Sequence, residues 1–206
     1  MSLKKSGPIY AVVLAAGESK RMGTPKALLP WGGTTVLEAV LVNILSSSVD
    51  RTLVVLGAER ARTGPLVQKY SASAVFNPDF RTGMLSSVQT GFRALPAECR
   101  AALVFLADQP WVRKEVIGRV ISAYFETDKG LVVPVYKGFG GHPFLVDMKY
   151  RKSVETLHAD VGLRELLSLY PQDIKRINIE DSSILLDLDT PADYRRSRAA
   201  KPPRRG

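Results

Sequence analysis

Apolar residues along the chain form two kinds of run: short unbroken ones, and longer ones whose apolar positions recur every three or four residues. Unbroken runs predict strands buried on both faces of a sheet, and the longer spacing predicts amphipathic helices. The predicted strands are Ile9–Leu14, Thr52–Leu56, Ala74–Phe76, Ala101–Leu106, Leu131–Tyr136, Pro143–Val146, Arg176–Ile179 and Ile184–Leu188. The predicted helices are Val36–Leu45, Arg60–Tyr70, Met84–Leu95, Lys114–Phe125, Gly162–Leu169 and Pro191–Arg198.

The alternation of strands and helices predicts the fold class. Strand, helix and strand in that order need crossover connections, which build a mostly parallel sheet with helices on both faces. We expect a Rossmann-like, three-layer α/β/α fold in one domain, because 206 residues compare with roughly 150 per domain. Ligands bind beyond the carboxyl ends of such strands, so the segments after Leu14, Leu106 and Leu188 are the first places to look.

The segment Leu14–Pro30 has the composition of a loop that binds a polyanion. Gly17 and Gly23 stand among small residues that let backbone amides approach a ligand, while Arg21 and Lys26 supply positive charge. The spacing is neither that of a Walker A loop nor G-x-G-x-x-G. A surface turn with solvated cations is the alternative, and the length of the loop favours a ligand.

Carboxylates follow two of the predicted strands. Asp108 comes directly after a buried run, where it either binds Mg²⁺ beside ligand phosphates or caps the next helix. Asp187 and Asp189 alternate along the predicted strand Ile184–Leu188 and therefore share one face. One of these two residues could instead cap the helix that begins at Pro191.

Two further segments carry polar groups at places typical of binding sites. Gly83 and Met84 open a helix whose first turn is expected to display Ser86 and Ser87. Groups of this kind at a helix start bind an anion or a base edge about as often as they merely cap the helix. His142 ends a glycine-rich link, KGFGG, which indicates close backbone approach or a mobile lid. A lone histidine is more often a hydrogen-bonded structural group.

Composition and charge exclude several classes of protein. Cys99 is the single cysteine, so no intrachain disulfide or cysteine zinc cage forms, and we interpret it as inert. Apolar runs are far shorter than the roughly 18 residues of a membrane span, and no signal peptide is apparent, so a cytoplasmic protein is expected. The net charge of +9 sits at the two ends, since residues 6–194 carry 21 basic against 20 acidic side chains. We expect the basic tail to be solvated, with binding to nucleic acid or a membrane surface as the weaker alternative.

The first-strand segment also carries a long specific motif. Its residues LAAG-x-S-x-RMG-x-PK-x-LL resemble the signature of the MobA-like nucleotidyltransferases. That family contains molybdenum cofactor guanylyl- and cytidylyltransferases and many sugar-phosphate nucleotidyltransferases, with a GT-A-like fold. The resemblance implies that Leu14, Ala15, Ala16 and Gly17 face the nucleotide. It also implies that Arg21 and Lys26 contact the phosphates, and the residues Ala16 and Pro25 resemble the cytidylyl branch.

Other motifs extend the resemblance over residues 11–194. The family's Asp-x-Pro and D-x-D-T-P motifs match at Asp108 and Asp189, which implies a pair of Mg²⁺ ligands, with Asp187 as second choice to Asp189. The string GM-x-x-S-x-x-x-G implies that Ser87 contacts the nucleotide. The G-G-H-P string implies that His142 binds the acceptor.

The stretch HADVGLREL resembles the family's Gly-Asp-x-Gly-x-Arg segment, which implies that Asp160 and Arg164 also bind the acceptor. Ala159 departs from this pattern, and His158 is interpreted as structural.

The resemblance implies a nucleotidyltransferase that moves CMP from CTP to the phosphate of molybdenum-bearing molybdopterin, with Arg21, Lys26 and Asp108 as catalytic residues and Mg²⁺ as cofactor. Residues 8–110 would bind the nucleotide and 111–194 the acceptor, followed by the tail 195–206. A molybdoenzyme or chaperone is the expected protein partner, and neither nucleic acid nor membrane is expected. The alternatives are a sugar phosphate or methylerythritol phosphate as acceptor, and a nucleotide-binding subunit without catalysis.

Overall fold

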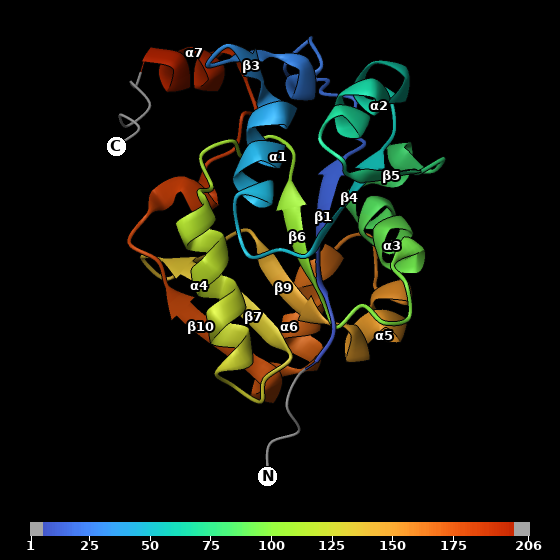
Figure 1. Ribbon diagram of the computed structural model, residues 1–206, viewed down its shortest axis with the longest axis vertical. Coiled ribbons are helices and arrows are strands. Elements are labelled where there is room, and N and C mark those ends of the chain that lie inside the picture. The colour runs from blue at the N-terminus through green and yellow to red at the C-terminus, as the bar shows by residue number, and fades with distance from the viewer. Residues whose placement is uncertain (1–5, 200–206) are drawn as a thin grey trace.

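The computed structural model describes residues 6–199, so Lys4, Lys5, Lys201, Arg204 and Arg205 of the two basic ends lie outside the described residues. An eight-stranded sheet forms its centre (Figure 1). Its strands are β1 (Ile9–Ala15), β4 (Arg51–Leu56), β5 (Ser73–Phe76), β6 (Ala101–Leu106), β7 (Leu131–Tyr136), β8 (Phe139–Gly140), β9 (Phe144–Asp147) and β10 (Ile174–Asn178). A small separate hairpin pairs β2 (Pro30–Trp31) with β3 (Thr34–Thr35).

The helices connect most of these strands. They are α1 (Val36–Leu45), α2 (Arg60–Lys69), α3 (Met84–Ala94), α4 (Lys114–Phe125), α5 (Arg151–Glu155), α6 (Glu165–Leu169) and α7 (Pro191–Ala199). Most predicted elements are present with bounds within two residues of the prediction, which is the usual uncertainty of a helix or strand end.

The order of strands across the sheet is β10-β7-β9-β6-β1-β4-β5, with β8 paired to β7. Strand β1 pairs in parallel with β4 on one side and β6 on the other, whereas β9 runs antiparallel between β6 and β7. The chain therefore moves from β1 towards β5 and later returns to the other side of β1. A reversal of this kind leaves a crevice at the carboxyl ends of the strands, here between β1 and β6.

Helices cover both faces of the sheet, and each face has its own apolar core. Leu41 of α1 and Ile117 of α4 belong to one core, and Phe92 of α3 and Leu166 of α6 belong to the other. In Figure 1, α1 and α4 cross in front of the strands and α6 lies behind them. The predicted three-layer, mostly parallel fold is confirmed, and its double covering explains why the central strands are apolar at nearly every position.

The predicted strand Ile184–Leu188 is wrong. A 3₁₀ turn covers Ser182–Leu185, and an irregular segment follows it. Ile184 and Leu188 are both fully buried, but they pack in two different apolar clusters and do not line one face of a sheet. The Ile184 carbonyl accepts from the His142 amide and the Leu188 amide donates to the Asp108 carbonyl, so this segment bonds to loops instead of to a neighbouring strand.

Other local features also differ from the sequence-based expectation. The predicted helix Gly162–Leu169 begins as a 3₁₀ turn at Gly162, whose φ of 71° lies in the left-handed region, and becomes α-helical only at Glu165. Helix α5 and the β2–β3 hairpin were not predicted, because both are too short to show a periodic pattern.

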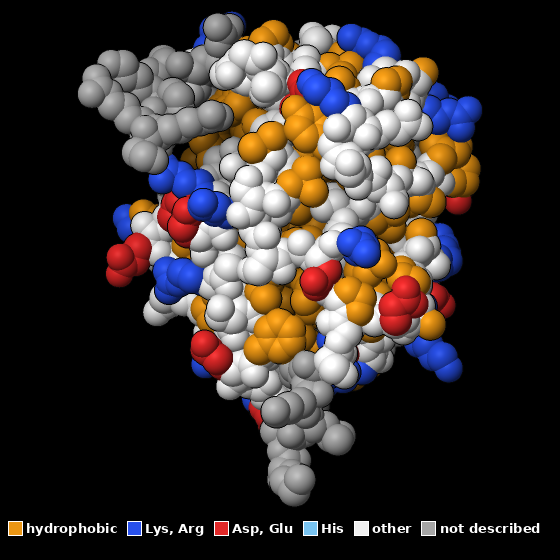
Figure 2. Space-filling model, in the orientation of Figure 1, with side chains coloured by type: hydrophobic (Ala, Val, Ile, Leu, Met, Phe, Trp, Pro, Cys, Tyr) orange, Lys and Arg blue, Asp and Glu red, His pale blue; other side chains and the backbone are white. Residues whose placement is uncertain are grey.

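Charge is spread over the described surface. Arg195 and Arg196 are part of α7, so the first residues of the expected basic tail are helical. Figure 2 shows positive and negative side chains interspersed over the visible face, which agrees with the balanced charge of residues 6–194. Within residues 6–199, no helix combines the length and the apolar composition needed to cross a membrane.

Candidate active site

Three segments that are distant in sequence meet at the carboxyl end of β1. The strand end carries the loop 16–29, and the adjacent β6 leads into Asp108. The backbone amide of Ala107 donates to the carbonyl of Leu14 at 3.2 Å, and that of Leu188 donates to the carbonyl of Asp108 at 3.3 Å. These bonds hold the segment around Leu188 against the crevice predicted from the strand order.

The loop after β1 is held by its own hydrogen bonds. Ser19 has a positive φ of 53°, and its carbonyl accepts from the amides of Met22 (3.0 Å) and Gly23 (3.2 Å). The Ser19 hydroxyl accepts from the backbone amide of Lys26 at 3.0 Å. Met22 is buried in a small apolar cluster with Leu188, so the loop and the distal segment share a packing contact.

The charged side chains of the loop converge on two carboxylates. The Lys26 ammonium Nζ donates to Asp108 Oδ2 at 2.8 Å and to Asp189 Oδ1 at 2.6 Å. The Arg21 guanidinium donates to the other oxygen of Asp189 at 2.9 Å. The Lys26 side chain is only 16% exposed, whereas that of Arg21 is 70% exposed. The structure therefore brings together four residues that the sequence placed in one site, across 163 positions of chain.

Charge complementarity in this cluster shifts two pKa values in opposite directions. Burial lowers the pKa of the Lys26 ammonium, but Asp108 and Asp189 outweigh burial and place that pKa above its ordinary value. The hydrogen bond from Lys26, followed by the charges of Lys26 and Arg21, lowers the pKa of Asp189 against the opposing effect of burial. Both shifts favour the charged forms of Lys26 and Asp189 at neutral pH.

The two carboxylates fit a divalent cation. Asp108 and Asp189 both lie within 2.8 Å of a single positive charge, the Lys26 ammonium, which serves as a stand-in cation. No group of three or more His, Cys, Asp and Glu residues placed to hold a metal occurs within residues 6–199. Two carboxylates with positions left for phosphate oxygens and water match the preference of Mg²⁺, which binds few protein ligands.

A third carboxylate, that of Asp187, lies beside this pair. The buried Gln109 donates from Nε2 to Asp187 Oδ1 at 2.8 Å. Partial removal from water raises the pKa of Asp187, and the negative charges of Asp108 and Asp189 raise it further. Sequence reasoning missed Gln109, although its position directly after Asp108 was the available signal.

The helix start after Asp189 has its own cap. The Thr190 hydroxyl accepts from the Asp193 amide at 3.2 Å, and the Asp193 carboxylate accepts from the Thr190 amide at 2.8 Å. Because Thr190 and Asp193 cap α7, neither Asp187 nor Asp189 does so. Asp108 caps no helix either, since α4 begins after Arg113.

The end of β1 packs tightly against the end of β4. Ala15 and Ala16 are buried, and Leu14 is half-buried. An ideal Cβ on Gly57 would lie 2.3 Å from the carbonyl oxygen of Ala16, so only glycine fits there. Gly17 is exposed with open space around it, which leaves its backbone accessible to a ligand.

Ser87 occupies a different environment from the one expected. It is buried, and its hydroxyl accepts from Asn77 Nδ2 at 3.0 Å, while the same amide donates to Ser86 at 2.9 Å. The expectation that the first turn of α3 displays Ser87 is therefore wrong. Asn77, which is fully buried after β5, ties this turn to the sheet and was not identified from the sequence.

His142 lies near the charged cluster, whereas Asp160 and Arg164, the other two residues expected to bind the acceptor, are exposed. Its Nδ1 lies 3.1 Å from the carbonyl oxygen of Val104. Burial lowers the pKa of His142; the positive charge of Arg164 also lowers it, and the negative charge of Asp108 acts in the opposite direction. Asp160 instead acts electrostatically on His158.

His158 is mostly exposed and pairs with Glu165 at 2.7 Å, whose hydrogen bond raises the pKa of His158. Cys99 is buried, and burial raises the pKa of its thiol to about 12, which leaves it protonated at neutral pH.

The glycine-rich link makes the close backbone approach that its composition predicted. Lys137 and Gly138 form a left-handed turn between β7 and β8, with φ values of 48° and 88°. An ideal Cβ on Gly141 would lie 2.2 Å from the Ile184 carbonyl oxygen, which accepts from the His142 amide at 3.0 Å. The link is therefore fastened to the segment that leads to Asp189.

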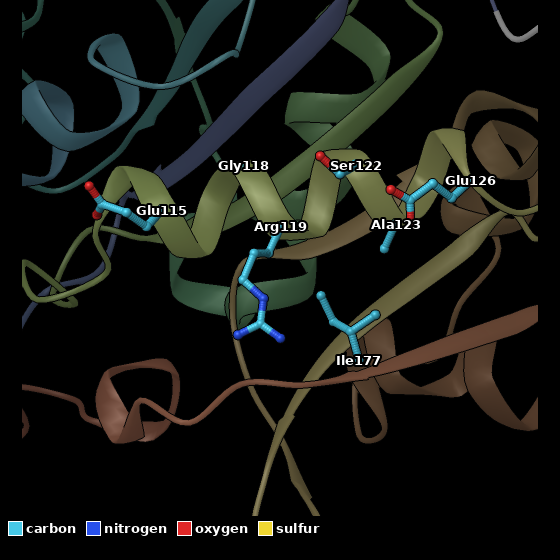
Figure 3. Close-up of a pocket in the computed structure, with 7 residues that line it drawn as sticks. All are labelled: Glu115, Gly118, Arg119, Ser122, Ala123, Glu126 and Ile177. Atoms are coloured by element: carbon cyan, nitrogen blue, oxygen red, sulfur yellow. The ribbon is translucent and has the colours of Figure 1, made fainter.

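A second hollow lies between α4 and β10, away from this cluster (Figure 3). It contains none of the predicted site residues. Arg119 points from α4 towards β10, where its guanidinium donates to the carbonyl of Asn178 at 2.7 Å. Glu115 and Glu126 lie near the two ends of the helix, so the hollow has no single charge that would select a ligand.

The chain matches the family model described as the MobA-like NTP transferase domain over residues 11–176. It is 28% identical over 190 residues to the molybdenum cofactor cytidylyltransferase of Escherichia coli (strain K12), with 90% of this chain and 93% of that protein covered. Two further relatives are nicotine blue oxidoreductase of Paenarthrobacter nicotinovorans (31% identity; 88% and 92% covered) and a probable molybdenum cofactor guanylyltransferase of Mycobacterium avium (strain 104; 30% identity; 91% and 93% covered).

A solved structure shares the fold along nearly the whole length. The crystal structure of Rv0371c from Mycobacterium tuberculosis H37Rv matches with a TM-score of 0.81 and 27% identity, covering 94% of this chain and 99% of that one. The same protein in complex with manganese matches with a TM-score of 0.75 at 26% identity over the same shares.

Proposed function

Because the chain belongs to the MobA-like NTP transferase family, we propose that it is a nucleotidyltransferase that moves CMP from CTP to the terminal phosphate of molybdenum-bearing molybdopterin. The observation that carries this proposal is the convergence of Lys26, Asp108 and Asp189 at the crevice beside β1. Such an arrangement supplies what a triphosphate needs, namely a lysine for its oxygens and two carboxylates for its metal ion.

The reaction joins the acceptor phosphate to the α-phosphorus of CTP. An oxygen of the acceptor attacks in line, a new P–O bond forms, and the bond to the leaving pyrophosphate breaks. A phosphate monoester is already ionised at neutral pH, so no protein base is required. Lys26 and Arg21 offset the charge that grows on the α-phosphate and the pyrophosphate, and the loop fixes their positions.

Asp108 and Asp189 are the residues that would hold Mg²⁺. When bound, the ion would supply positive charge that neutralises part of the negative charge of the phosphates. Support comes from the convergence of both carboxylates on one cation, and from the structural relative that was crystallised with manganese.

The remaining proposed contacts follow from the sequence motifs. Leu14–Gly17 lead from β1 into the loop and would face the nucleotide. His142, which feels the charges of both Arg164 and Asp108, would bind the acceptor together with Arg164 and the exposed Asp160. Ser87 is buried, so its proposed effect on the nucleotide is through the position of the α3 turn. A molybdoenzyme or chaperone in the cytoplasm would receive the product.

The choice of CTP rests on the loop residues Ala16 and Pro25 and on the Escherichia coli cytidylyltransferase relative. GTP is the competing nucleotide, as the name of the mycobacterial relative indicates, and a sugar phosphate is the competing acceptor. The decisive assay measures pyrophosphate release from CTP and from GTP with Mg²⁺, with and without molybdopterin. We expect acceptor-dependent release from CTP and a cytosine dinucleotide product by mass spectrometry. Release that does not depend on molybdopterin would overturn the acceptor assignment.

Two substitutions test the proposed catalytic residues. Lys26→Ala and Asp108→Ala should each lower turnover by at least roughly a hundredfold, because the first removes a cation that offsets charge in the transition state and the second removes a carboxylate that would hold the metal ion. Lys69→Ala and Asp128→Ala serve as matched controls, since Lys69 pairs with Glu38 on another part of the surface and Asp128 is exposed after α4. Near-normal turnover of either site variant would count against its role.

A further inference from the structure

The Lys26 ammonium occupies the space between the two carboxylates that would hold a metal ion. It lies 2.8 Å from Asp108 Oδ2 and 2.6 Å from Asp189 Oδ1, and the exposed fractions of the Lys26 and Asp108 side chains are 16% and 19%. These are charge-assisted hydrogen bonds between partly buried side chains, which salt screens less than exposed ones. The ammonium therefore already offsets one of the two negative charges of the carboxylates before any ligand binds, and the Arg21 guanidinium, 2.9 Å from Asp189, offsets the other.

A divalent cation cannot take this position while the ammonium remains there. Both cations would need the same two oxygens, and two positive charges a few ångströms apart repel strongly in a partly buried site. Binding of the metal ion alone must therefore break both Lys26 ion pairs and leave the ammonium without a partner, which weakens the affinity for the metal ion.

A triphosphate removes this obstacle. The backbone of Lys26 is fixed by the Ser19 hydroxyl at 3.0 Å, but its side chain is a flexible four-carbon stem with a compact charge. Phosphate oxygens arriving beside the loop provide the ammonium with new anionic partners. The carboxylates then become free for the metal ion at the moment when its other ligands, the phosphates, are present.

We propose that Lys26 is an internal counterion that competes with the divalent cation for Asp108 and Asp189, so that metal ion and triphosphate bind with positive coupling. This inference rests on the proposed function only in taking a triphosphate as ligand. Its consequence is that the protein takes up little free metal ion and assembles the complete site only around the nucleotide. Arg21 adds a weaker barrier, because it contacts one oxygen of Asp189 and is mostly exposed.

The test measures binding of Mn²⁺ alone, without nucleotide, from the loss of the free-ion signal in electron paramagnetic resonance. Lys26→Met should bind Mn²⁺ at least about fivefold more tightly than the unaltered protein, the lower end of ordinary site-to-site coupling. Lys69→Met removes a lysine from an ion pair with the single carboxylate of Glu38 and should leave Mn²⁺ binding unchanged. Arg21→Met should gain less Mn²⁺ affinity than Lys26→Met. The gain in Lys26→Met should persist at high salt.

Lys26→Gln provides a second version of the same change, with thermal unfolding as the check that both variants are folded. Unchanged or weaker Mn²⁺ binding in folded Lys26→Met and Lys26→Gln overturns the inference. No nucleotide or acceptor enters this measurement, so it is independent of the transfer assay. If the unaltered protein transfers CMP but the Lys26 variants bind Mn²⁺ no more tightly, only the counterion role is overturned. If the variants bind Mn²⁺ more tightly but the unaltered protein does not transfer CMP, only the proposed reaction is overturned.

Discussion

At the scale of single residues, the environment of each carboxylate decides what it does. Glu38 is as strongly paired as Asp189, yet its role is structural. Its side chain accepts from Lys69 Nζ at 2.9 Å, from the Tyr70 hydroxyl at 3.2 Å and from the Thr35 amide at 2.9 Å. The bond from the Thr35 amide is half of a capping box at the start of α1, and none of the three partners belongs to the charged cluster.

The pKa of Glu38 predicts part of the acid sensitivity of the protein. The hydrogen bond from Lys69, and then those from Thr35 and Tyr70, lower this pKa from 4.5 to about 2 against the effect of burial. The resulting stabilisation is fully present above pH 4.5 and is lost as pH falls towards 2, because the unfolded chain takes up the proton first. Glu38→Gln should therefore be less stable than the unaltered protein at pH 7, and the difference should shrink below pH 4.5.

Urea unfolding at pH 7, 5, 4 and 3 measures this difference. Glu155→Gln, at an exposed position at the end of α5, is the control whose difference from the unaltered protein should stay small throughout. A Glu38→Gln deficit that is the same at pH 7 and pH 3 would contradict the assignment.

At the scale of elements, strand ends and loops are held in place by close backbone approach. Gly57 follows β4 and lies against Ala16, whose carbonyl accepts from the Ala58 amide at 3.2 Å. The loop that carries Lys26 leaves the sheet at this point. Its direction therefore depends on a contact that has no room for a methyl group.

Two alanine substitutions separate close approach from helix propensity. Gly57→Ala places a Cβ 2.3 Å from the Ala16 oxygen and should lower the free energy of unfolding by about 1–3 kcal/mol, as expected for overpacking. Gly118→Ala lies inside α4 with no atom within 4 Å of the new Cβ, so it should raise stability by up to about 1 kcal/mol. Urea unfolding of both variants checks this, and a Gly57→Ala protein as stable as the unaltered one would disprove the packing argument.

At the scale of the whole molecule, a small apolar cluster joins the parts of the site. Met22 of the loop, Leu29, Val36 of α1 and Leu188 pack together, with Trp31, Trp111 and Tyr194 at the edge. Leu188 is the residue directly before Asp189, and its amide is bonded to the Asp108 carbonyl. This cluster therefore holds the second carboxylate opposite the first.

Truncating Leu188 should lower both stability and turnover, whereas truncating a core residue far from the site should lower stability alone. Leu188→Ala and Leu131→Ala each empty a fully buried position and should each cost about 2–5 kcal/mol of unfolding free energy. Leu131 lies at the start of β7 in the core of the other face, so only Leu188→Ala should also reduce transferase turnover well beyond the loss of folded protein. Turnover per folded molecule, compared between the two variants, measures this, and equal turnover would show that Leu188 does not position Asp189.

Sequence patterns alone determined most of the elements and several positions of the site. Strand β6 and helix α4 have the predicted bounds, because apolar spacing is a local property of each segment. The place of Asp108 directly after a buried strand likewise follows from the sequence, and so does the cationic loop after β1. Each of these inferences needed only a few consecutive residues.

The tertiary structure alone decided which segments become neighbours. Local spacing cannot show that β1 lies between β4 and β6, nor that Lys26 reaches Asp189 across 163 positions. For the same reason Ile184 and Leu188 resembled a strand, although each fills a different apolar cluster. Contacts between distant segments depend on the packing of the whole chain, and that packing is what places Gln109 on Asp187 and the ammonium between the carboxylates.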